Sequence, residues 1–221
     1  MIPLVFHPIY SQLDLPYRHR FPIEKYQGIY AALIAQGVNE TDFHTPEPLD
    51  PIKLSQVYDH TYINELCSGK LDPKAMRRIG FPWSEQLIQR TLTAAGGTVL
   101  TAQLALEHGK ALNLTGGYHH AFADFGSGFC MVNDLYLAAL TMLTKPGIDS
   151  VLIFDCDVHQ GDGTAKLAQG NANIFTVSIH GEKNFPHRKQ VSDMDIGLAK
   201  GAGDTEYLET VDSALHLAFI Q

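Results

Sequence analysis

The feature that most constrains the fold is a run of four apolar residues, Val151 to Phe154, followed at once by acids and a histidine. A continuous apolar run of this length is typical of a central parallel strand that is buried on both faces. A second such run, from Ile174 to Ile179, ends at His180. Because segments with helical periodicity separate these runs, the sequence predicts an α/β fold. Its sheet is expected to be doubly wound and mainly parallel, with flanking helices.

The longest periodic segment, residues 85–108, contains the pair Gly96-Gly97. Each glycine costs a helix about 1 kcal/mol, so the pair predicts that another backbone packs closely at this point. Short strands are also expected at 4–6 and 111–114. Further helices are expected at residues 22–35, 54–66 (in pieces), 133–143, 161–167 and 204–220.

Composition narrows the class of protein. The chain has 221 residues, 45% of them apolar, and a net charge of −8, which fits one α/β domain over residues 1–221 and argues against a broad basic surface for nucleic acid. The first residues lack the basic start of a signal peptide, and no apolar stretch approaches the ~18 residues of a membrane span. The three cysteines form no CxxC pair, which indicates reduced thiols. We therefore expect a cytoplasmic protein.

Asp157 and His159 are candidate metal ligands. Residues i and i+2 of an extended segment point the same way, so these two side chains would enter one crevice beyond the strand. A carboxylate oxygen and an imidazole nitrogen suit Zn²⁺, Fe²⁺ or Mn²⁺. A hydrolytic zinc centre has three protein ligands, so the third must come from elsewhere. Taken singly, Asp157 is also explained as a helix N-cap and His159 as a core histidine.

The adjacent pair His119-His120 is a candidate for proton transfer, because a metal-activated water needs a base and its leaving amine needs an acid. A carboxylate on the far ring nitrogen would fix each tautomer and raise the basicity of the imidazole. Asp155 and Asp162 are the available carboxylates, which suggests two His–Asp dyads. The structural alternative is a pair of ordinary turn residues on a solvated loop.

Several blocks together resemble the signatures of the zinc-dependent histone deacetylase family, in its order and close to its spacing. The N-terminal and C-terminal blocks resemble its compact bacterial and class IV branch. The blocks are His19-Arg20-Phe21-Pro22, Gly116-Gly117-Tyr118-His119-His120-Ala121, Gly128 to Asp134, Asp155 to Gly163, and Phe185-Pro186-His187-Arg188-Lys189 with Ser192-Asp193.

The resemblance implies an arginase-like fold and hydrolysis of an acetyl or related acyl amide on lysine or a small amine. It implies a zinc or iron ion and a structural potassium ion. In this implied scheme His120, oriented by Asp162, is the main base and acid, and His119, paired with Asp155, stays protonated. The other implied residues are the metal ligands Asp157 and His159, the tunnel residues Gly128, Phe129 and Phe185, the acetate-channel residue Arg20, and the potassium ligands Asp155, Asp157, His159, Ser178 and Ile179.

Two departures from the family pattern stand out. The family's third metal ligand, an aspartate, and its transition-state tyrosine follow the last predicted helix, and neither block occurs here. The sequence is therefore expected to lack C-terminal strands, to bind metal weakly and to have little activity alone. In place of the rim aspartate of many members stands Gly80-Phe81-Pro82-Trp83. Trp83 is either an aromatic rim for the substrate or a packing residue.

Two rival functions remain open. The first is a catalytically silent module or inactive fragment that keeps the fold. The second, a two-manganese arginase-type hydrolase, is disfavoured because it needs more carboxylates around these segments. The expected partner is an acyl-lysine protein or an acylated small amine, and the sequence indicates no oligomeric state.

Overall fold

The computed structural model describes residues 2–220 and divides into two compact units. Unit 1 contains residues 2–138 and unit 2 contains residues 139–220. The single domain expected over residues 1–221 stays a prediction, and Met1 and Gln221 lie outside the described residues.

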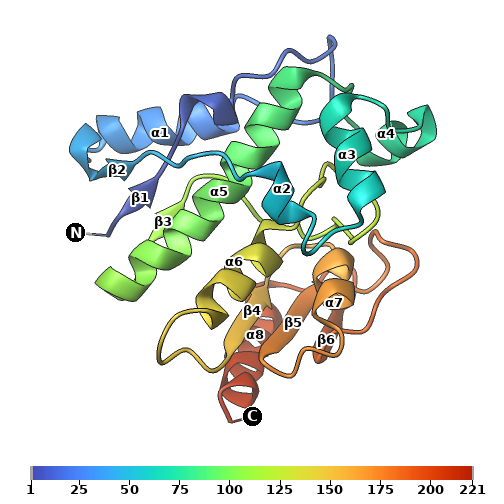
Figure 1. Ribbon diagram of the computed structural model, residues 1–221. Coiled ribbons are helices and arrows are strands. Elements are labelled where there is room, and N and C mark those ends of the chain that lie inside the picture. Colours follow the sequence, from blue (N-terminus) through green and yellow to red (C-terminus); the bar gives the residue numbers. More distant parts are fainter. Residues whose placement is uncertain (1, 221) are drawn as a thin grey trace. The chain divides into compact units, whose positions relative to one another are not determined.

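Unit 1 is mainly helical and contains one small sheet (Figure 1). Its elements are β1 (Leu4–Val5), the 3₁₀ turn η1 (Pro8–Tyr10), α1 (Lys25–Ala35), η2 (Glu40–Asp42), β2 (Phe43–His44), α2 (Pro51–Leu54), α3 (His60–Ser68), α4 (Pro73–Ile79), α5 (Glu85–His108), β3 (Leu112–Asn113) and the start of α6 (Asp134–Leu143).

The predicted helix at 85–108 is confirmed at both ends. Ser84 caps α5 by accepting a hydrogen bond from the Leu87 amide, and Gly109 ends the helix in a left-handed conformation. A Cβ on Gly96 would collide with the backbone carbonyl of Glu47. The close backbone approach predicted from the glycine pair is therefore confirmed.

The unit 1 sheet has the order β2-β1-β3, and all its strands are parallel. The predicted strands at 4–6 and 111–114 are confirmed, though each pairs over only two residues. The sequence analysis missed β2, because a strand of two residues carries no detectable alternation. The buried core lies mostly between helices and includes Tyr10, Ile63, Leu66, Leu87 and Val132.

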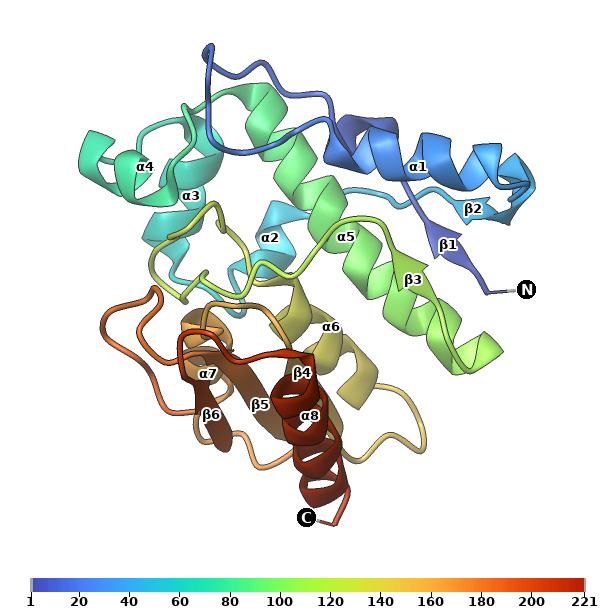
Figure 2. The same ribbon diagram turned by 180° about the vertical axis from the view of Figure 1, so that it is seen from behind.

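Unit 2 is a parallel sheet of order β4-β5-β6 with helices on both faces. Figures 1 and 2, which view the molecule from opposite sides, show α7 against one face of this sheet and α8 against the other. These parallel strands and flanking helices confirm the predicted α/β class. The elements are the end of α6, β4 (Val151–Asp155), α7 (Asp162–Ala168), β5 (Ile174–Gly181), β6 (Met194–Leu198) and α8 (Asp204–Ala218).

One prediction about this sheet is wrong. The run Val151–Phe154 was expected to form a central strand, but within the unit 2 sheet β4 is an edge strand that pairs only with β5. Within β4, only Ile153 in the middle is buried. The central position belongs to β5, where Ile174 and Thr176 to His180 are buried. A second strand that the analysis missed, β6, alternates apolar Met194, Ile196 and Leu198 with Asp195 and Gly197.

Candidate active site

The histidine pair lies in unit 1, on the turn that follows β3. The ring centroids of His119 and His120 are 4.1 Å apart, with an angle of 48° between the ring planes. The two residues are only 6% and 4% exposed. The alternative of ordinary residues on a solvated loop is therefore wrong, since both imidazoles are held in the interior.

Asp134, at the start of α6, anchors this turn. Its Oδ1 accepts a hydrogen bond of 2.7 Å from the Tyr118 amide, and its Oδ2 accepts one of 3.0 Å from the Gly117 amide. The Thr98 hydroxyl donates a third bond, of 2.5 Å, to Oδ2. Burial raises the pKa of Asp134, and these hydrogen bonds oppose the rise. The sequence analysis did not single out this residue, although it belongs to one of the family blocks.

Gly128 gives the ring of His120 its space. A Cβ at this position would lie 2.7 Å from Cδ2 of His120, and the backbone φ of +53° disfavours any side chain. Phe129 itself has a φ of +68° and is fixed by its amide, which donates to the Ile79 carbonyl at 2.7 Å. The Phe129 ring packs near Phe21 and Phe81, with centroids 5.2 and 5.1 Å away.

Trp83 and Arg20 also belong to unit 1. The Trp83 indole N–H donates to the Leu66 carbonyl at 2.7 Å, and its ring lies directly over Gly69, so that a Cβ there would be 2.9 Å away. Of the two explanations for Trp83, these contacts favour packing. Arg20 is exposed. Its role in an acetate channel stays a prediction.

The two candidate metal ligands lie together in unit 2. His159 Nδ1 is 2.9 Å from Asp157 Oδ1, and the side chains are 42% and 50% exposed. They lie in bends beyond β4, which ends at Asp155, and not on extended strand as predicted. A local hydrogen bond of 2.9 Å from the Asp157 amide to Asp155 Oδ1 shapes this bend.

This donor pair fits part of a zinc site. A carboxylate with an imidazole is a donor set that zinc and iron accept. The 2.9 Å contact between the two side chains is a hydrogen bond, so its proton must leave before both atoms can bind one ion. Within residues 2–220, however, no group of three or more His, Cys, Asp or Glu side chains gathers as metal ligands. Among the described residues, the Asp157–His159 pair is therefore one ligand short of the three that a hydrolytic zinc centre normally has.

Gln160 fixes the bend that carries this pair, and the sequence analysis missed it. Its side chain is 1% exposed, and its amide nitrogen donates to the Gln190 carbonyl at 2.8 Å and to Asp195 Oδ1 at 2.7 Å. Its amide oxygen accepts from the Gln190 N–H at 2.9 Å. No signal in the sequence marks Gln160 beyond its place beside His159.

The residues assigned to a potassium ion adjoin one another in unit 2. Asp155 and Ser178 are register partners of the β4–β5 pair, and Ser178 and Ile179 are buried. The Val158 carbonyl accepts a hydrogen bond of 2.9 Å from the Gly181 amide, so the bend and the end of β5 run side by side. The potassium site itself stays a prediction.

Asp162 and Phe185 complete the candidate residues of unit 2. Asp162 is 5% exposed, begins α7 and accepts a hydrogen bond of 3.0 Å from the Gly163 amide. Phe185 is 38% exposed, and its ring meets that of His159 edge to face at 6.1 Å. The predicted His–Asp dyads join residues of different units, and they stay predictions.

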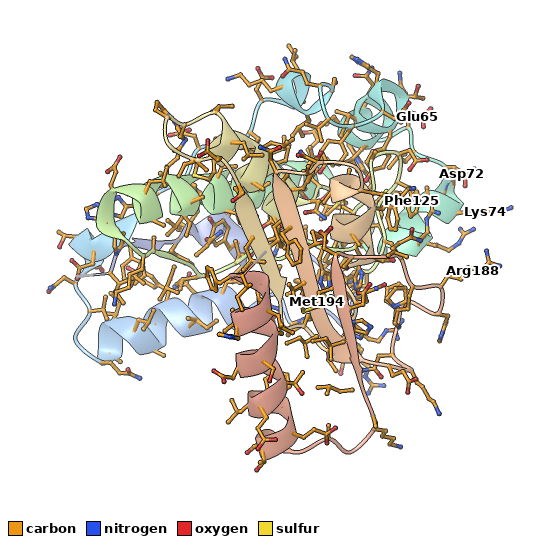
Figure 3. All side chains as sticks on the ribbon, turned by 90° about the horizontal axis from the view of Figure 1, so that it is seen from below. Glu65, Asp72, Lys74, Phe125, Arg188 and Met194 are labelled. Carbon is orange, nitrogen blue, oxygen red and sulfur yellow. The ribbon has the colours of Figure 1, made fainter. Side chains whose placement is uncertain are left out.

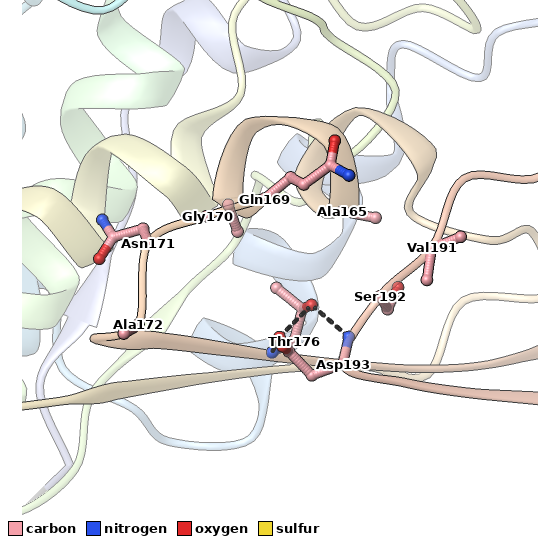
Figure 4. Close-up of a pocket in the computed structure, with 10 residues that line it drawn as sticks. Ala165, Gln169, Gly170, Asn171, Ala172, Thr176, Val191, Ser192 and Asp193 are labelled. Atoms are coloured by element: carbon pink, nitrogen blue, oxygen red, sulfur yellow. Dashed lines mark hydrogen bonds between the residues drawn. The ribbon is translucent and has the colours of Figure 1, made fainter.

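Two cavities lie within unit 2. One of about 330 Å³ lies beside Thr176, whose amide and hydroxyl both donate to Asp193 Oδ2, at 2.7 and 2.8 Å (Figure 4). The other, of about 650 Å³, is lined in part by the exposed Cys156 and by Tyr207. A hydrogen bond to Cys156, with burial, raises the pKa of Tyr207 to about 12. Cys156 is thus a hydrogen-bond partner of Tyr207 in this cavity.

The fold is shared with solved structures of known class. A histone deacetylase (HDAC) homologue complexed with SAHA superposes with a TM-score of 0.79 at 23% identity, over 97% of this chain and 64% of that one. An HDAC homologue from Aquifex aeolicus gives a TM-score of 0.78 at the same identity and the same coverage. These matches place the chain in the fold class of the histone deacetylases.

A histone deacetylase domain also matches residues 19–220 in sequence. The chain belongs to the histone deacetylase family. It is 49% identical over 208 residues to an uncharacterized protein of Picosynechococcus, covering 94% of this chain and 69% of that protein. Histone deacetylase 2 of Arabidopsis thaliana is 27% identical, over 90% of this chain and 54% of the plant protein. The chain thus spans between half and about two thirds of these relatives.

Membrane insertion through a helix finds no support in the structure. Between residues 2 and 220, no helix is both long enough and apolar enough to span a bilayer.

Proposed function

We propose that this chain carries most of the active site of a metal-dependent amidohydrolase that removes acetyl or related acyl groups from lysine or a small amine. The observation that carries the proposal is the Asp157–His159 pair, with 2.9 Å between its donor atoms, in a chain of the histone deacetylase family. The buried histidine pair of unit 1 supports it, because two adjacent interior imidazoles suit proton transfer better than packing.

Asp157 and His159 would hold a zinc or iron ion. When bound, the metal would polarise the amide carbonyl and lower the pKa of its water to about 7. The hydrogen bonds of Gln160 hold the bend that presents both ligands, which limits the ordering that metal binding must supply. The adjoining backbone of Asp155 to His159, with Ser178 and Ile179, would bind potassium through oxygen atoms.

His120 and His119 would divide the proton transfers. His120, paired with Asp162, would take a proton from the attacking water and give one to the leaving amine. His119, paired with Asp155, would stay protonated and stabilise the negative charge that develops on the carbonyl oxygen. The Gly128 backbone fixes the position of the His120 ring, because it leaves that ring the space a side chain would take.

Phe129 and Phe185 would form the walls that hold the acyl-lysine stem, since an apolar stem with a polar amide suits an aromatic lining. The expected substrate is an acyl-lysine protein or an acylated small amine.

The metal assignment is tested by zinc titration against a chromophoric chelator. The variants Asp157→Asn and His159→Ala should weaken zinc binding by tenfold or more, because each removes one of two converging donors. Matched controls are Asp212→Asn and His216→Ala, which change exposed residues of α8 in the same unit. Equal weakening in the controls would show that zinc binds elsewhere on the surface.

The catalytic assignment is tested by acyl release from acetyl-lysine peptides, longer acyl-lysine peptides and acetylated polyamines. We expect slow release by the zinc-loaded chain that stops with a chelator and falls at least a hundredfold in His120→Ala. Zinc binding without any acyl release would instead support the catalytically silent module.

A further inference from the structure

Part of the surface of unit 1 carries a charge opposite to that of the whole chain. Residues 17–20 and 70–80 contain six of the chain's 16 lysines and arginines but only one of its 24 acidic residues, Asp72. Because the chain has a net charge of −8, this local excess of positive charge would attract an anionic partner. The six side chains, here called the basic cluster, are all exposed: Arg18, Arg20, Lys70, Lys74, Arg77 and Arg78.

Salt bridges do not neutralise the basic cluster. Within residues 2–220, none of its six members forms an ion pair with an acidic side chain. Asp72, the acid among them, caps α4 and accepts a hydrogen bond of 2.6 Å from the Lys74 amide. Because no existing ion pair would have to break, the cluster can pair with an anion from outside the chain.

Arg78, at the end of α4, joins the basic cluster to the loop that follows the histidine pair. Its carbonyl accepts a hydrogen bond of 3.3 Å from the Gly128 amide, and its guanidinium lies 4.1 Å from the ring centroid of Phe125. Lys74 precedes Arg78 by four residues and therefore lies on the same face of α4. Figure 3 shows the Lys74 side chain extending outward. The cluster thus borders the segment that carries the candidate site.

Residues 17–20 lie beside the end of the same helix. His19 Nε2 is 2.8 Å from the carbonyl oxygen of Gly80, the residue that ends α4. Arg18 has a left-handed φ of +63°, which is uncommon for a residue with a side chain. Its guanidinium lies 5.2 Å from the ring centroid of Tyr17, which is 90% exposed. This loop therefore presents an arginine and an aromatic ring to solvent next to α4.

We propose that the basic cluster binds acidic residues that flank the acyl-lysine of a substrate protein. A peptide whose acyl-lysine stem lies against Phe129 would place its neighbouring residues beside the cluster, because the Phe129 amide is bonded to the last turn of α4. Guanidinium groups pair with carboxylates through two parallel hydrogen bonds, which favours aspartate and glutamate. The role in substrate choice rests on the proposed function, whereas the binding of an acidic peptide does not.

The same charges disfavour other partners. An acylated polyamine keeps cationic amines, and a lysine-rich peptide is cationic throughout, so the cluster would repel both. Nucleic acid is disfavoured for a different reason. It binds broad basic surfaces, whereas this cluster comes from two short segments of a chain with a pI of about 5.7. Of the substrates left open by the proposed function, the cluster therefore selects an acyl-lysine protein with acidic flanks.

The test is fluorescence anisotropy of labelled acetyl-lysine peptides that differ only in whether aspartates, serines or lysines flank the acetyl-lysine. It uses the metal-free 221-residue chain, so no catalysis is needed. At low salt we expect the aspartate peptide to bind about tenfold more tightly than the serine peptide, and the lysine peptide to bind weakest. This preference should shrink to less than about threefold at 1 M salt, where charges act over only about 3 Å.

A matched pair of double variants locates the binding surface. Lys74→Gln combined with Arg77→Gln should weaken binding of the aspartate peptide about fivefold, because two cations of the cluster are lost. Lys53→Gln combined with Lys110→Gln removes the same charge from exposed residues elsewhere in unit 1 and should leave the affinity within about twofold. Arg78 is left intact, since its side chain also packs on Phe125.

Three results would overturn the inference. Equal affinity for the aspartate and lysine peptides would remove the charge selectivity, and equal weakening in the two double variants would place the binding elsewhere. A single-stranded oligonucleotide that binds more tightly than the aspartate peptide would assign the cluster to nucleic acid. Binding of the aspartate peptide without acyl release from any substrate would refute only the proposed function. Acyl release without a preference for acidic flanks would refute only this inference.

Discussion

The two units reach their cores in different ways. Unit 1 has strands of only two residues, yet it buries large side chains such as Tyr10, Leu66 and Leu87 between its helices. Unit 2 is organised on longer strands, but the apolar residues on the α8 side of its sheet are mostly half-buried around Val177, Ile179 and Ala214. In this protein, the unit with the longer strands is therefore not the unit that buries its apolar side chains more deeply.

The same contrast applies to the candidate chemistry. The histidine pair lies in the tightly packed unit and is almost fully enclosed, whereas the Asp157–His159 pair is about half exposed. Proton-transfer groups benefit from a fixed, dry environment, and metal ligands need an approach for ion and water. The more enclosed unit thus carries the candidate proton-transfer groups, and the more open unit carries the candidate ligands.

The largest effect should come from a matched pair of leucine truncations. Leu87→Ala, in the core of unit 1, should lower the free energy of unfolding by about 3 kcal/mol, because a fully buried leucine leaves a cavity. Leu152→Ala, on half-buried β4, should cost about 1 kcal/mol, because less apolar surface is lost. Urea unfolding measures both. Equal costs would break the contrast between the units.

Asp134→Asn should have the next largest effect and should lower the free energy of unfolding by about 2 kcal/mol. The amide keeps the shape of the side chain but loses one acceptor, which leaves a buried donor from Gly117, Tyr118 or Thr98 without a partner. Comparison with Asp124→Asn, at an exposed aspartate of the same unit, isolates the effect of the turn. A cost no larger than that of the control would show that the turn does not depend on this carboxylate.

The pH dependence of the stability difference between the wild type and Asp134→Asn gives a second test of this carboxylate. Burial raises the pKa of Asp134 above its ordinary 3.8, so the folded chain holds this proton more tightly than the unfolded chain. The resulting stabilisation is fully present below about 3.8 and is lost as the pH rises through the folded-state pKa. The stability advantage of the wild type over Asp134→Asn should therefore shrink as the pH rises from 4. An advantage that grows would mean that the hydrogen bonds outweigh burial.

Gln160→Ala tests a buried polar residue in the more open unit and should cost about 1.5 kcal/mol. It removes three hydrogen bonds and leaves groups of Gln190 and Asp195 unsatisfied. It should also weaken zinc binding severalfold, since the bend that holds Asp157 and His159 loses its anchor. Gln169→Ala, at an exposed glutamine of the same unit, is the control. Unchanged zinc affinity would show that the bend is fixed without Gln160.

Much of the fold could be predicted because periodicity and end signals coincide. The helix at 85–108 has both a serine cap and a glycine stop, and both ends were predicted. The run Val151–Phe154 predicted a strand correctly but its place in the sheet wrongly. An apolar run indicates that a segment can be buried, but it does not indicate which neighbouring strands will bury it. Asp134 and Gln160 escaped prediction, since their roles depend on contacts between segments distant in sequence.

The smallest difference between a variant and its control concerns the glycine beside the histidine pair. Gly128→Ala and Gly109→Ala both place a side chain at positive φ, of +53° and +78°, which costs about 1 kcal/mol in each case. A Cβ at Gly109 would meet open space, whereas one at Gly128 would press on the His120 ring. Gly128→Ala should therefore cost about 1 kcal/mol more and should shift the His120 ring resonances in NMR spectra, which Gly109→Ala should leave in place. If both variants lose the same stability and the His120 resonances do not move, the side chains of unit 1 can shift to make room for the added methyl group. The interior of unit 1 would then be less rigid than its burial suggests.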